Sequence, residues 1–411
     1  MVEKAPQGLR KASRVLRWAV LGTVLVAVTV ISVLHQKLGI AKPVGVDALC
    51  PFGGLETLGS LLSDGTLIKK VALSSVLLLG VTIVTELVFR RAFCGRICPL
   101  GFLQELFGGL GRRIFKHRPE LPAALDRPAR YLKYVVLAAL LYLSWSTASL
   151  VIRPYDPWVA YNHLTSAELF TENAVGLGIL VTALIGSLVY DRFFCKYACP
   201  MGAFLGLISR FSLFKVTRNA ESCIDCKLCD KACPTNVRVS EITRMNSAEC
   251  IDCAECVAAC PVRDTLAVQG PGARALAPVK AGVFALGTFA ILVAAATATG
   301  YFEWTVPTLG EQIERASGEG VEATADAVFD TALIKGSTTM GEVVDASGIP
   351  ASVFTYVYAV PASEQDRQLK ELKETYGCSP GEVRAFVEAY WDDPAVADAW
   401  IVGAFEEEEE H

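Results

Sequence analysis

Eight of the fourteen cysteines in this 411-residue chain form two runs with identical spacing. Each run reads C-x2-C-x2-C-x3-C-P, and the pair extends from Cys223 to Pro261. Thiolates at this spacing wrap a cubane iron–sulfur cluster, and the fourth cysteine of each run binds the cluster of the other run. Zinc sites or disulfides fit less well, because zinc sites favour two separated C-x2-C pairs. The sequence predicts two [4Fe–4S] clusters, one bound by Cys223, Cys226, Cys229 and Cys260 and the other by Cys250, Cys253, Cys256 and Cys233.

Four further cysteines form two C-x3-C-P motifs, Cys94 with Cys98 and Cys195 with Cys199, which are offset by 101 residues. Thiols four residues apart lie on one face of a helix. The shared context, Phe-Cys-x3-Cys-Pro-x-Gly, indicates an internal duplication. If the duplication brings the two pairs together, they form a four-thiolate set. We favour a third [4Fe–4S] cluster there over two redox dithiols or a zinc site.

The elements that position these motifs are predicted to lie in a membrane, because 52% of the residues are hydrophobic. Five apolar stretches approach the length that spans a bilayer. They cover about residues 18–36, 70–89, 131–152, 174–190 and 279–301. Lys and Arg are concentrated before the first stretch, between the second and third, and after the fourth. The positive-inside rule places these segments in the cytoplasm, with the first stretch as an uncleaved span.

The expected fold is a mainly α membrane protein built from duplicated two-helix transmembrane hairpins. An α+β two-cluster ferredoxin domain, a fifth transmembrane helix and a small helical extracytoplasmic domain follow. The predicted domains are a four-helix membrane domain at 1–215, the ferredoxin domain at 216–270, the fifth helix at 279–301 and an acidic periplasmic domain at 302–411.

The last of these domains has its own sequence signals. From residue 302 onward there are 23 acidic and 6 basic residues, a net charge of −17, so the rest of the chain carries +12. Thr339-x-x-Glu342 and Ser379-Pro-Gly-Glu382 each predict the start of a helix. A third helix is predicted at Ser363–Tyr376, and the run Glu406–Glu410 is predicted to be a solvated tail.

Local patterns predict further contacts near the cytoplasmic ends of the spans. The apolar-basic segments 102–115 and 204–214, which follow the two C-x3-C-P motifs, are predicted to lie along the membrane surface as helices. Glu86 is expected to pair with Arg90, one helical turn further on.

Residues 15–270 resemble the NapH/NosR/PceC-type membrane polyferredoxins in their spans, C-x3-C-P motifs and ferredoxin run. The run from Cys50 to Glu56, C-P-F-G-G-L-E, is similar to a motif after the first span in many relatives. The resemblance implies electron transfer linked to the quinone pool, often supporting a periplasmic reductase. NosR-type members carry an additional flavin domain that this chain lacks.

The expected function is that of an iron–sulfur subunit of a respiratory complex in the bacterial inner membrane. It would relay electrons between the quinone pool or a periplasmic cytochrome or reductase and a cytoplasmic redox protein. The subunit is expected to be non-catalytic, with quinone oxidoreductase activity left open. The alternative is a CcoG-like assembly or maturation factor that reduces a metal or thiol for another enzyme. No motif for binding nucleic acid is present.

A quinone site requires an apolar pocket with a few polar groups at the bilayer edge. The candidates predicted on the outer side are His35, Cys50, Glu56, Asp156 and His163. Asp156 or His163 would accept quinol protons. Ordinary interfacial polar residues are the alternative for each, and haem or flavin is disfavoured. Cys50 and Cys378 remain after the three clusters, and an extracytoplasmic disulfide or a buried thiol suits Cys378 equally well.

Overall fold

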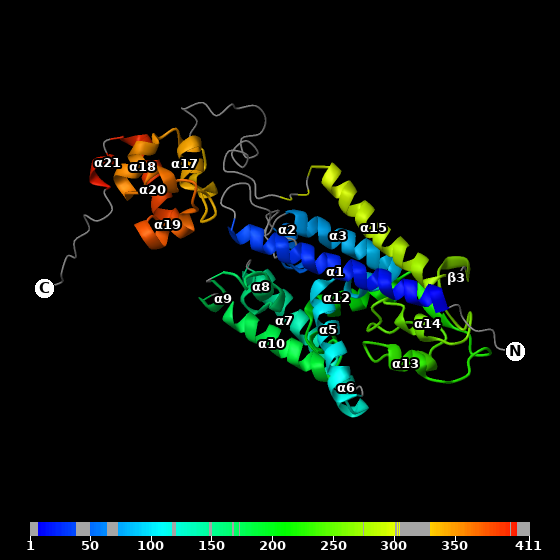
Figure 1. Cartoon of the computed structure of the whole chain (residues 1–411). Coiled ribbons are helices and arrows are strands. Elements are labelled where there is room, and N and C mark those ends of the chain that lie inside the picture. Colours follow the sequence, from blue (N-terminus) through cyan, green and yellow to red (C-terminus); the bar gives the residue numbers. More distant parts are fainter. Residues whose placement is uncertain are drawn as a thin grey trace. The chain divides into compact units, whose positions relative to one another are not determined.

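The apolar stretches of the chain fold as helices, and the cysteine-rich segment with α13 and α14 lies beside one end of them (Figure 1). A computed structural model describes residues 7–37, 50–63, 73–116, 121–147, 150–166, 168–171, 173–273, 275–300, 302, 304, 329–394 and 396–400. The chain divides into two compact units. The first comprises residues 1–33 and 45–303, and the second comprises 34–44 and 304–411.

The described secondary structure up to residue 300 is dominated by helices. They are α1 (Gln7–Lys37), α2 (Pro51–Ser63), α3 (Leu73–Phe89), α4 (Ala92–Arg96), α5 (Pro99–Phe115), α6 (Ala123–Ala129), α7 (Leu132–Thr147), α8 (Pro157–Asn162), α9 (Glu168–Thr171), α10 (Ala174–Val189), α11 (Phe193–Tyr197), α12 (Pro200–Ile208), α13 (Leu228–Ala232), α14 (Glu255–Ala259) and α15 (Pro278–Ala298). The strands are β1 (Lys215–Arg218), β2 (Leu266–Gln269) and β3 (Ala275–Leu276).

Two of the described helices are long and apolar enough to cross a bilayer, α1 over Lys11–His35 and α15 over its whole length. Helices α3, α10 and α7 coincide with the other three predicted stretches, but they have only 17, 16 and 16 residues. A span requires about 20 residues, so the prediction of five spans stays a prediction.

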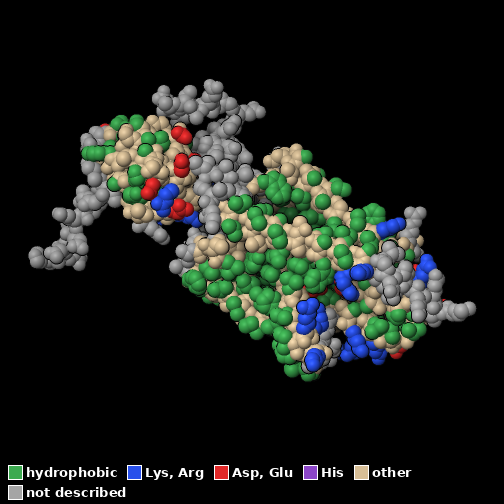
Figure 2. All heavy atoms as spheres, viewed as in Figure 1, with side chains coloured by type: hydrophobic (Ala, Val, Ile, Leu, Met, Phe, Trp, Pro, Cys, Tyr) green, Lys and Arg blue, Asp and Glu red, His purple; other side chains and the backbone are tan. Residues whose placement is uncertain are grey.

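Apolar side chains cover much of the helical surface on the face that Figure 2 shows, and Lys and Arg gather toward the end with α5, α6 and the ferredoxin strands. Val135 on α7, Ile185 on α10 and Ile291 on α15 are each more than half exposed. A surface with so many exposed aliphatic groups is unfavourable in water and suits contact with lipid.

Helices α2, α8 and α9 occupy the two loops at 37–69 and 153–173, and none of them was expected from the sequence. Helix α2 approaches α3 so closely that a Cβ atom on Gly54 would lie 2.5 Å from the carbonyl oxygen of Ser75. Helix α8 contacts α1, where the Ser32 hydroxyl donates to the Asn162 side-chain oxygen at 2.7 Å. Both loops therefore fold back against the long helices.

The duplicated segments form α3-α4-α5 and α10-α11-α12. In each copy the second cysteine of C-x3-C-P precedes a proline at the first position of the next helix, which is a favoured start. The predicted surface helix at 102–115 is part of α5, which packs against the end of α10. There, a Cβ atom on Gly111 would lie 1.8 Å from the Leu188 carbonyl oxygen. The second predicted surface segment is α-helical to Ile208, continues as a 3-10 helix over Ser209–Phe211, and then leads into β1.

The expected pair of Glu86 with Arg90 is wrong. Helix α3 ends at Phe89, and Arg90 adopts a left-handed conformation with φ of 54°. This turn directs its guanidinium to the carbonyl oxygen of Met245 at 2.8 Å, while Glu86 accepts from the backbone N–H of Phe93 at 3.0 Å. The helical i,i+4 relation ends where the helix ends.

The ferredoxin part is a three-stranded antiparallel sheet, ordered β1-β2-β3, with α13 and α14. Val216 of β1 pairs with Val268 of β2, and both side chains are buried in its core. It lies beside the N-terminal end of α1 (Figure 1), where Arg14 forms an ion pair with Glu255 at 2.7 Å.

The second unit contains the described helices α17 (Met340–Ser347), α18 (Ala351–Tyr358), α19 (Leu369–Tyr376), α20 (Pro380–Asp392) and α21 (Val396–Ala399). Both predicted helix starts are confirmed as reciprocal capping boxes, at Thr339 with Glu342 and at Ser379 with Glu382. The predicted helix at 363–376 begins only at Leu369, and α18 was not predicted. The predicted tail at 406–410 lies outside the described residues.

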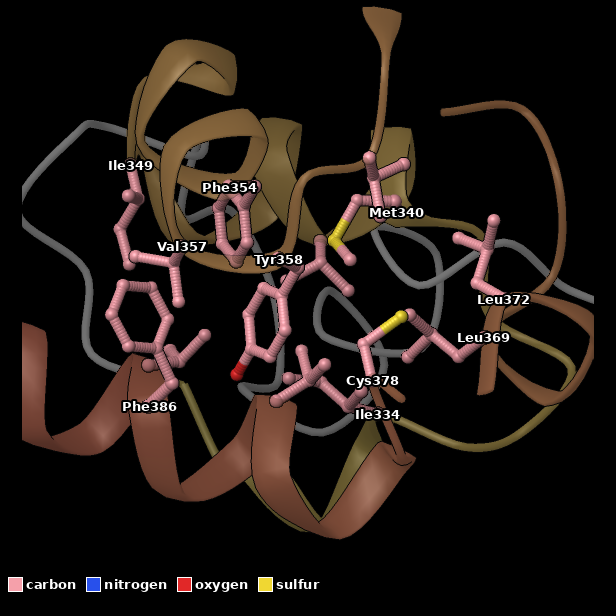
Figure 3. Close-up of a cluster of buried hydrophobic side chains, with 14 of the residues drawn as sticks. Ile334, Met340, Ile349, Phe354, Val357, Tyr358, Leu369, Leu372, Cys378 and Phe386 are labelled. Atoms are coloured by element: carbon pink, nitrogen blue, oxygen red, sulfur yellow. The ribbon is translucent and has the colours of Figure 1, made fainter. Parts of the chain in front are cut away.

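The second unit also contains a repeat that the sequence analysis missed. Thr339 and Gln368, 29 residues apart, are the N-caps of α17 and α19 and pair with each other in an isolated antiparallel bridge. Gly348 and Gly377, again 29 apart, end these two helices at φ of 68° and 72°. The unit is therefore a pair of similar helical hairpins that share one apolar core (Figure 3).

Candidate functional site

The ferredoxin part has two recesses, and each is lined by four cysteines. Cys223, Cys226, Cys229 and Cys260 line the first recess. Cys233, Cys250, Cys253 and Cys256 line the second. The last cysteine of each run thus lies with the first three cysteines of the other run, which is the arrangement that the spacing predicts.

Both recesses are formed by backbone in the same unusual conformation. Asp225 and Lys227 in the first run, and Asp252 and Ala254 at the equivalent places in the second, have φ between 50° and 57°. Non-glycine residues rarely adopt this left-handed conformation, and it is retained where the surroundings enforce it. In the second recess, the backbone N–H of Val237 donates to the Sγ of Cys233 at 3.3 Å. Such donors suit thiolate ligands.

The two recesses differ in their access to solvent. Cys226 is exposed, and Ile224 and Leu228 beside it are 54% and 43% exposed. In the second recess, Cys233 and Cys256 are buried. The positive charge of Arg17 on α1 interacts with the Cys253 thiol, which shows that the second recess lies near the N-terminal part of α1. The first recess therefore faces the surrounding solution and the second faces the helical part.

The C-x3-C thiols of the two repeats lie together, as the duplication predicts. Burial and then the charges of Cys94 and Cys195 raise the pKa of Cys98 to about 12. Burial, Cys195, Cys94 and Cys98 together raise the pKa of Cys199. Cys98 and Cys199 are therefore each within electrostatic range of cysteines from the other repeat. We call these four residues the membrane-face thiols.

A zinc site and a cubane cluster require different separations between their four cysteine ligands. Within the described ranges, no three His, Cys, Asp or Glu side chains are grouped as ligands of one metal ion. The sulfurs of a zinc site with four cysteine ligands lie about 3.8 Å apart, since all four bind one ion at about 2.3 Å. In a cubane cluster each thiolate binds a different iron, so the ligands stand further apart.

Two buried arginines cross between the repeats at the membrane-face thiols. Arg91, from the first repeat, packs against Gly202 of the second: a Cβ atom added to Gly202 would lie 2.8 Å from Nη2 of Arg91. In the same way, a Cβ atom added to Gly101 of the first repeat would lie 2.8 Å from Nη1 of Arg192 of the second. Nη2 of Arg91 is 4.0 Å from the Sγ of Cys94. Arg91 and Arg192 place positive charge beside the thiols, and aligning the two repeats would have revealed them.

Neighbouring polar groups hold this arrangement. Gln104 on α5 donates through Nε2 to the Sγ of Cys195 at 3.1 Å. Glu105 accepts from Arg192 at 2.9 Å and from Arg17 at 2.5 Å. Burial disfavours the Glu105 carboxylate, yet Arg192 and Arg17 lower its pKa to about 2. Glu105 is therefore ionised at neutral pH and orients both guanidinium groups.

The predicted quinone residues divide into two sets. Burial raises the pKa of the Cys50 thiol, and the charges of Asp156 and Cys98 raise it further. Burial also raises the pKa of Glu56 to about 7, against the hydrogen bond from Ser144, and Asp156 adds to this effect. Asp156 therefore lies within electrostatic range of both Cys50 and Glu56, and Cys50 also lies within range of Cys98.

The two histidines are placed elsewhere. His163 caps the C-terminal end of α8, where its Nδ1 lies 2.9 Å from the carbonyl oxygen of Val159. Asp156 caps the other end of that helix, about 10 Å away along its axis. His35 lies in the last turn of α1.

Cys378 is a buried free thiol. Its side chain is fully buried among Ile334, Leu369 and Leu372 in the core of the second unit (Figure 3). Of the two interpretations left open by the sequence, the structure supports the apolar core residue over the extracytoplasmic disulfide.

Comparison with known families confirms the repeat and the ferredoxin run. A 4Fe-4S binding domain matches the chain twice, at residues 71–118 and 172–219, with the 101-residue offset seen in the sequence. A 4Fe-4S dicluster domain matches residues 215–261. The chain therefore contains 4Fe–4S-binding domains.

Several curated proteins are similar to this chain. The putative electron transport protein YccM of Escherichia coli is 35% identical over 277 residues, which is 65% of this chain and 77% of YccM. The methylamine utilization ferredoxin-type protein MauN of Paracoccus denitrificans is 30% identical over 40% of this chain and 54% of its own length. The regulatory protein NosR of Pseudomonas aeruginosa is 30% identical over 35% of this chain and 20% of NosR. No solved structure matches the chain.

Proposed function

Because the chain belongs to the NapH/NosR-like family of membrane ferredoxin-type proteins, we propose that it is an iron–sulfur electron-transfer subunit with three [4Fe–4S] clusters. The two ferredoxin recesses and the membrane-face thiols hold one cluster each. The clusters supply reversible one-electron transfer when bound.

This proposal rests on the spatial order of the three cysteine groups, from the membrane-face thiols through the second recess to the first recess. The charge of Arg192 interacts both with Cys195 of the membrane-face thiols and with Cys253 of the second recess. The second recess adjoins the first, which opens to solvent at Cys226. Electrons would therefore pass between the membrane, the second recess and a soluble partner that docks at the first.

The membrane end of this path is proposed to exchange electrons with a quinone or a periplasmic partner. Glu56, whose pKa of about 7 suits a group that exchanges protons near neutral pH, supports a quinone site beside Asp156 and Cys50. The interaction of Cys50 with Cys98 supports electron transfer from that site to the membrane-face thiols. The ferredoxin part is proposed to lie in the cytoplasm and the second unit in the periplasm.

The test is iron analysis and spectroscopy of the purified full-length protein. About twelve irons per chain and three distinct cluster signals are expected, and a quinol should reduce at least the cluster at the membrane-face thiols. About eight irons would refute the third cluster and leave the ferredoxin pair. Reduction by a soluble ferredoxin without any response to quinol would instead refute the quinone connection.

A further inference from the structure

A cavity of about 410 Å³ lies between α6, the segment after α10 and the ferredoxin part. It is within the size range of small-molecule sites. Its basic lining residues are Arg127, Arg130, Lys196 and Arg238. We call this space the basic cavity. It adjoins the second recess, because Val237 lines both, and Lys196 directly follows Cys195 of the membrane-face thiols.

The two carboxylates of the basic cavity are already neutralised. Asp126 accepts from Nε of Arg130 at 2.8 Å and from the Tyr197 hydroxyl at 2.6 Å. Glu249 forms ion pairs with Lys133 and Arg91. Arg238 is paired with Glu241 at 3.1 Å, so Arg127 and Lys196 are the basic lining residues without an ion pair among the described residues.

Lys196 shows this lack of an ion pair most clearly. It is only 3% exposed, and its ammonium donates to the Asn236 side-chain oxygen at 3.0 Å. No carboxylate within the described part of the chain lies within 4 Å of it. Asp126 and Asp191 interact with this ammonium only from beyond ion-pair distance, and a buried ammonium without a directly paired counter-ion is unfavourable. An anion in the cavity would supply the missing charge.

The position of the cavity indicates the kind of anion. It is lined by Tyr190, directly after α10, and by Arg130, just before α7. Beside it, Leu125 and Leu132 are 60% and 52% exposed. Basic groups at the ends of apolar helices, next to exposed aliphatic side chains, match the headgroup region of a membrane. Arginine and lysine are the usual partners of phosphate there.

We propose that the basic cavity binds a phosphate group, supplied either by an anionic phospholipid or by a soluble phosphate compound. Lys196 holds the anion from the buried side, and Arg127 holds it from the open side. This inference does not depend on the proposed electron transfer.

The test measures phosphate and lipid binding by the delipidated full-length protein with its clusters. Inorganic phosphate and short-chain phosphatidylglycerol are titrated separately, with phosphatidylcholine as the uncharged reference, and thermal stabilisation is recorded. Two cavity variants, Lys196→Gln and Arg127→Gln, are compared with the control variant Arg113→Gln. Arg127 is exposed, so its variant should fold even if Lys196→Gln does not. Arg113 is an exposed arginine of α5 that does not line the cavity.

Each cavity variant is expected to weaken binding at least tenfold while Arg113→Gln leaves it unchanged. Stabilisation by phosphatidylglycerol alone assigns the phosphate to a lipid, and stabilisation by inorganic phosphate assigns it to a soluble compound. The proposal is overturned if neither ligand stabilises the protein more than phosphatidylcholine does, or if Arg113→Gln weakens binding as much as Arg127→Gln does.

Discussion

The charge of Arg91 should set the potential of the cluster at the membrane-face thiols. Arg91 is buried, and its Nη2 lies 4.0 Å from the Sγ of Cys94. Reduction adds one electron to the cluster, and a neighbouring positive charge favours that step. For separations of about 4 to 8 Å at an effective dielectric of about 20, the interaction is about 2 to 4 kcal/mol. For a one-electron couple this corresponds to roughly 90 to 180 mV.

The perturbation is Arg91→Gln, which removes the charge and keeps a donor. We expect the potential of this cluster, measured by a redox titration followed by electron paramagnetic resonance, to fall by roughly 90 to 180 mV. Arg91→Lys retains the charge and should shift the potential far less. Arg192→Gln, the equivalent change in the other repeat, should act in the same direction. Equal shifts in Arg91→Gln and Arg91→Lys would refute the argument, because packing rather than charge would then be responsible.

Three further predictions follow from buried groups. Cys199→Ser should remove about four irons per chain by elemental analysis, whereas Cys50→Ser should remove none. Cys378→Ser places an unpaired hydroxyl in the core of the second unit, so it should lower the free energy of unfolding of that unit by about 1 to 3 kcal/mol without changing the iron content. Because the folded pKa of Glu56 is raised to about 7, its contribution to stability is present below about pH 4.5 and is lost as the pH rises through 7. Between about pH 4.5 and pH 7 the free energy of unfolding, measured by thermal unfolding, should therefore fall by about 3 kcal/mol, and Glu56→Gln should abolish this fall. The same fall with pH in Glu56→Gln would contradict the assignment.

The sequence alone determined the features that depend on local spacing. Cysteine spacing within each run predicted which four thiols line each recess, because ligand geometry is encoded over a few residues. The 101-residue repeat predicted that the membrane-face thiols would meet. Both capping boxes of the second unit were correct for the same reason, since a cap involves residues only three apart.

Tertiary structure decided the contacts between distant segments. Arg90 turns away from Glu86 toward Met245, 155 residues further along the chain. The loop that contains α2 folds back against α3, and Cys50 at its start lies within electrostatic range of Cys98. The basic cavity brings Lys196 against Asn236 from the ferredoxin part. Periodicity and spacing describe one segment at a time, whereas these contacts depend on how separate segments pack, and that packing is set by the sum of many weak interactions over the whole core.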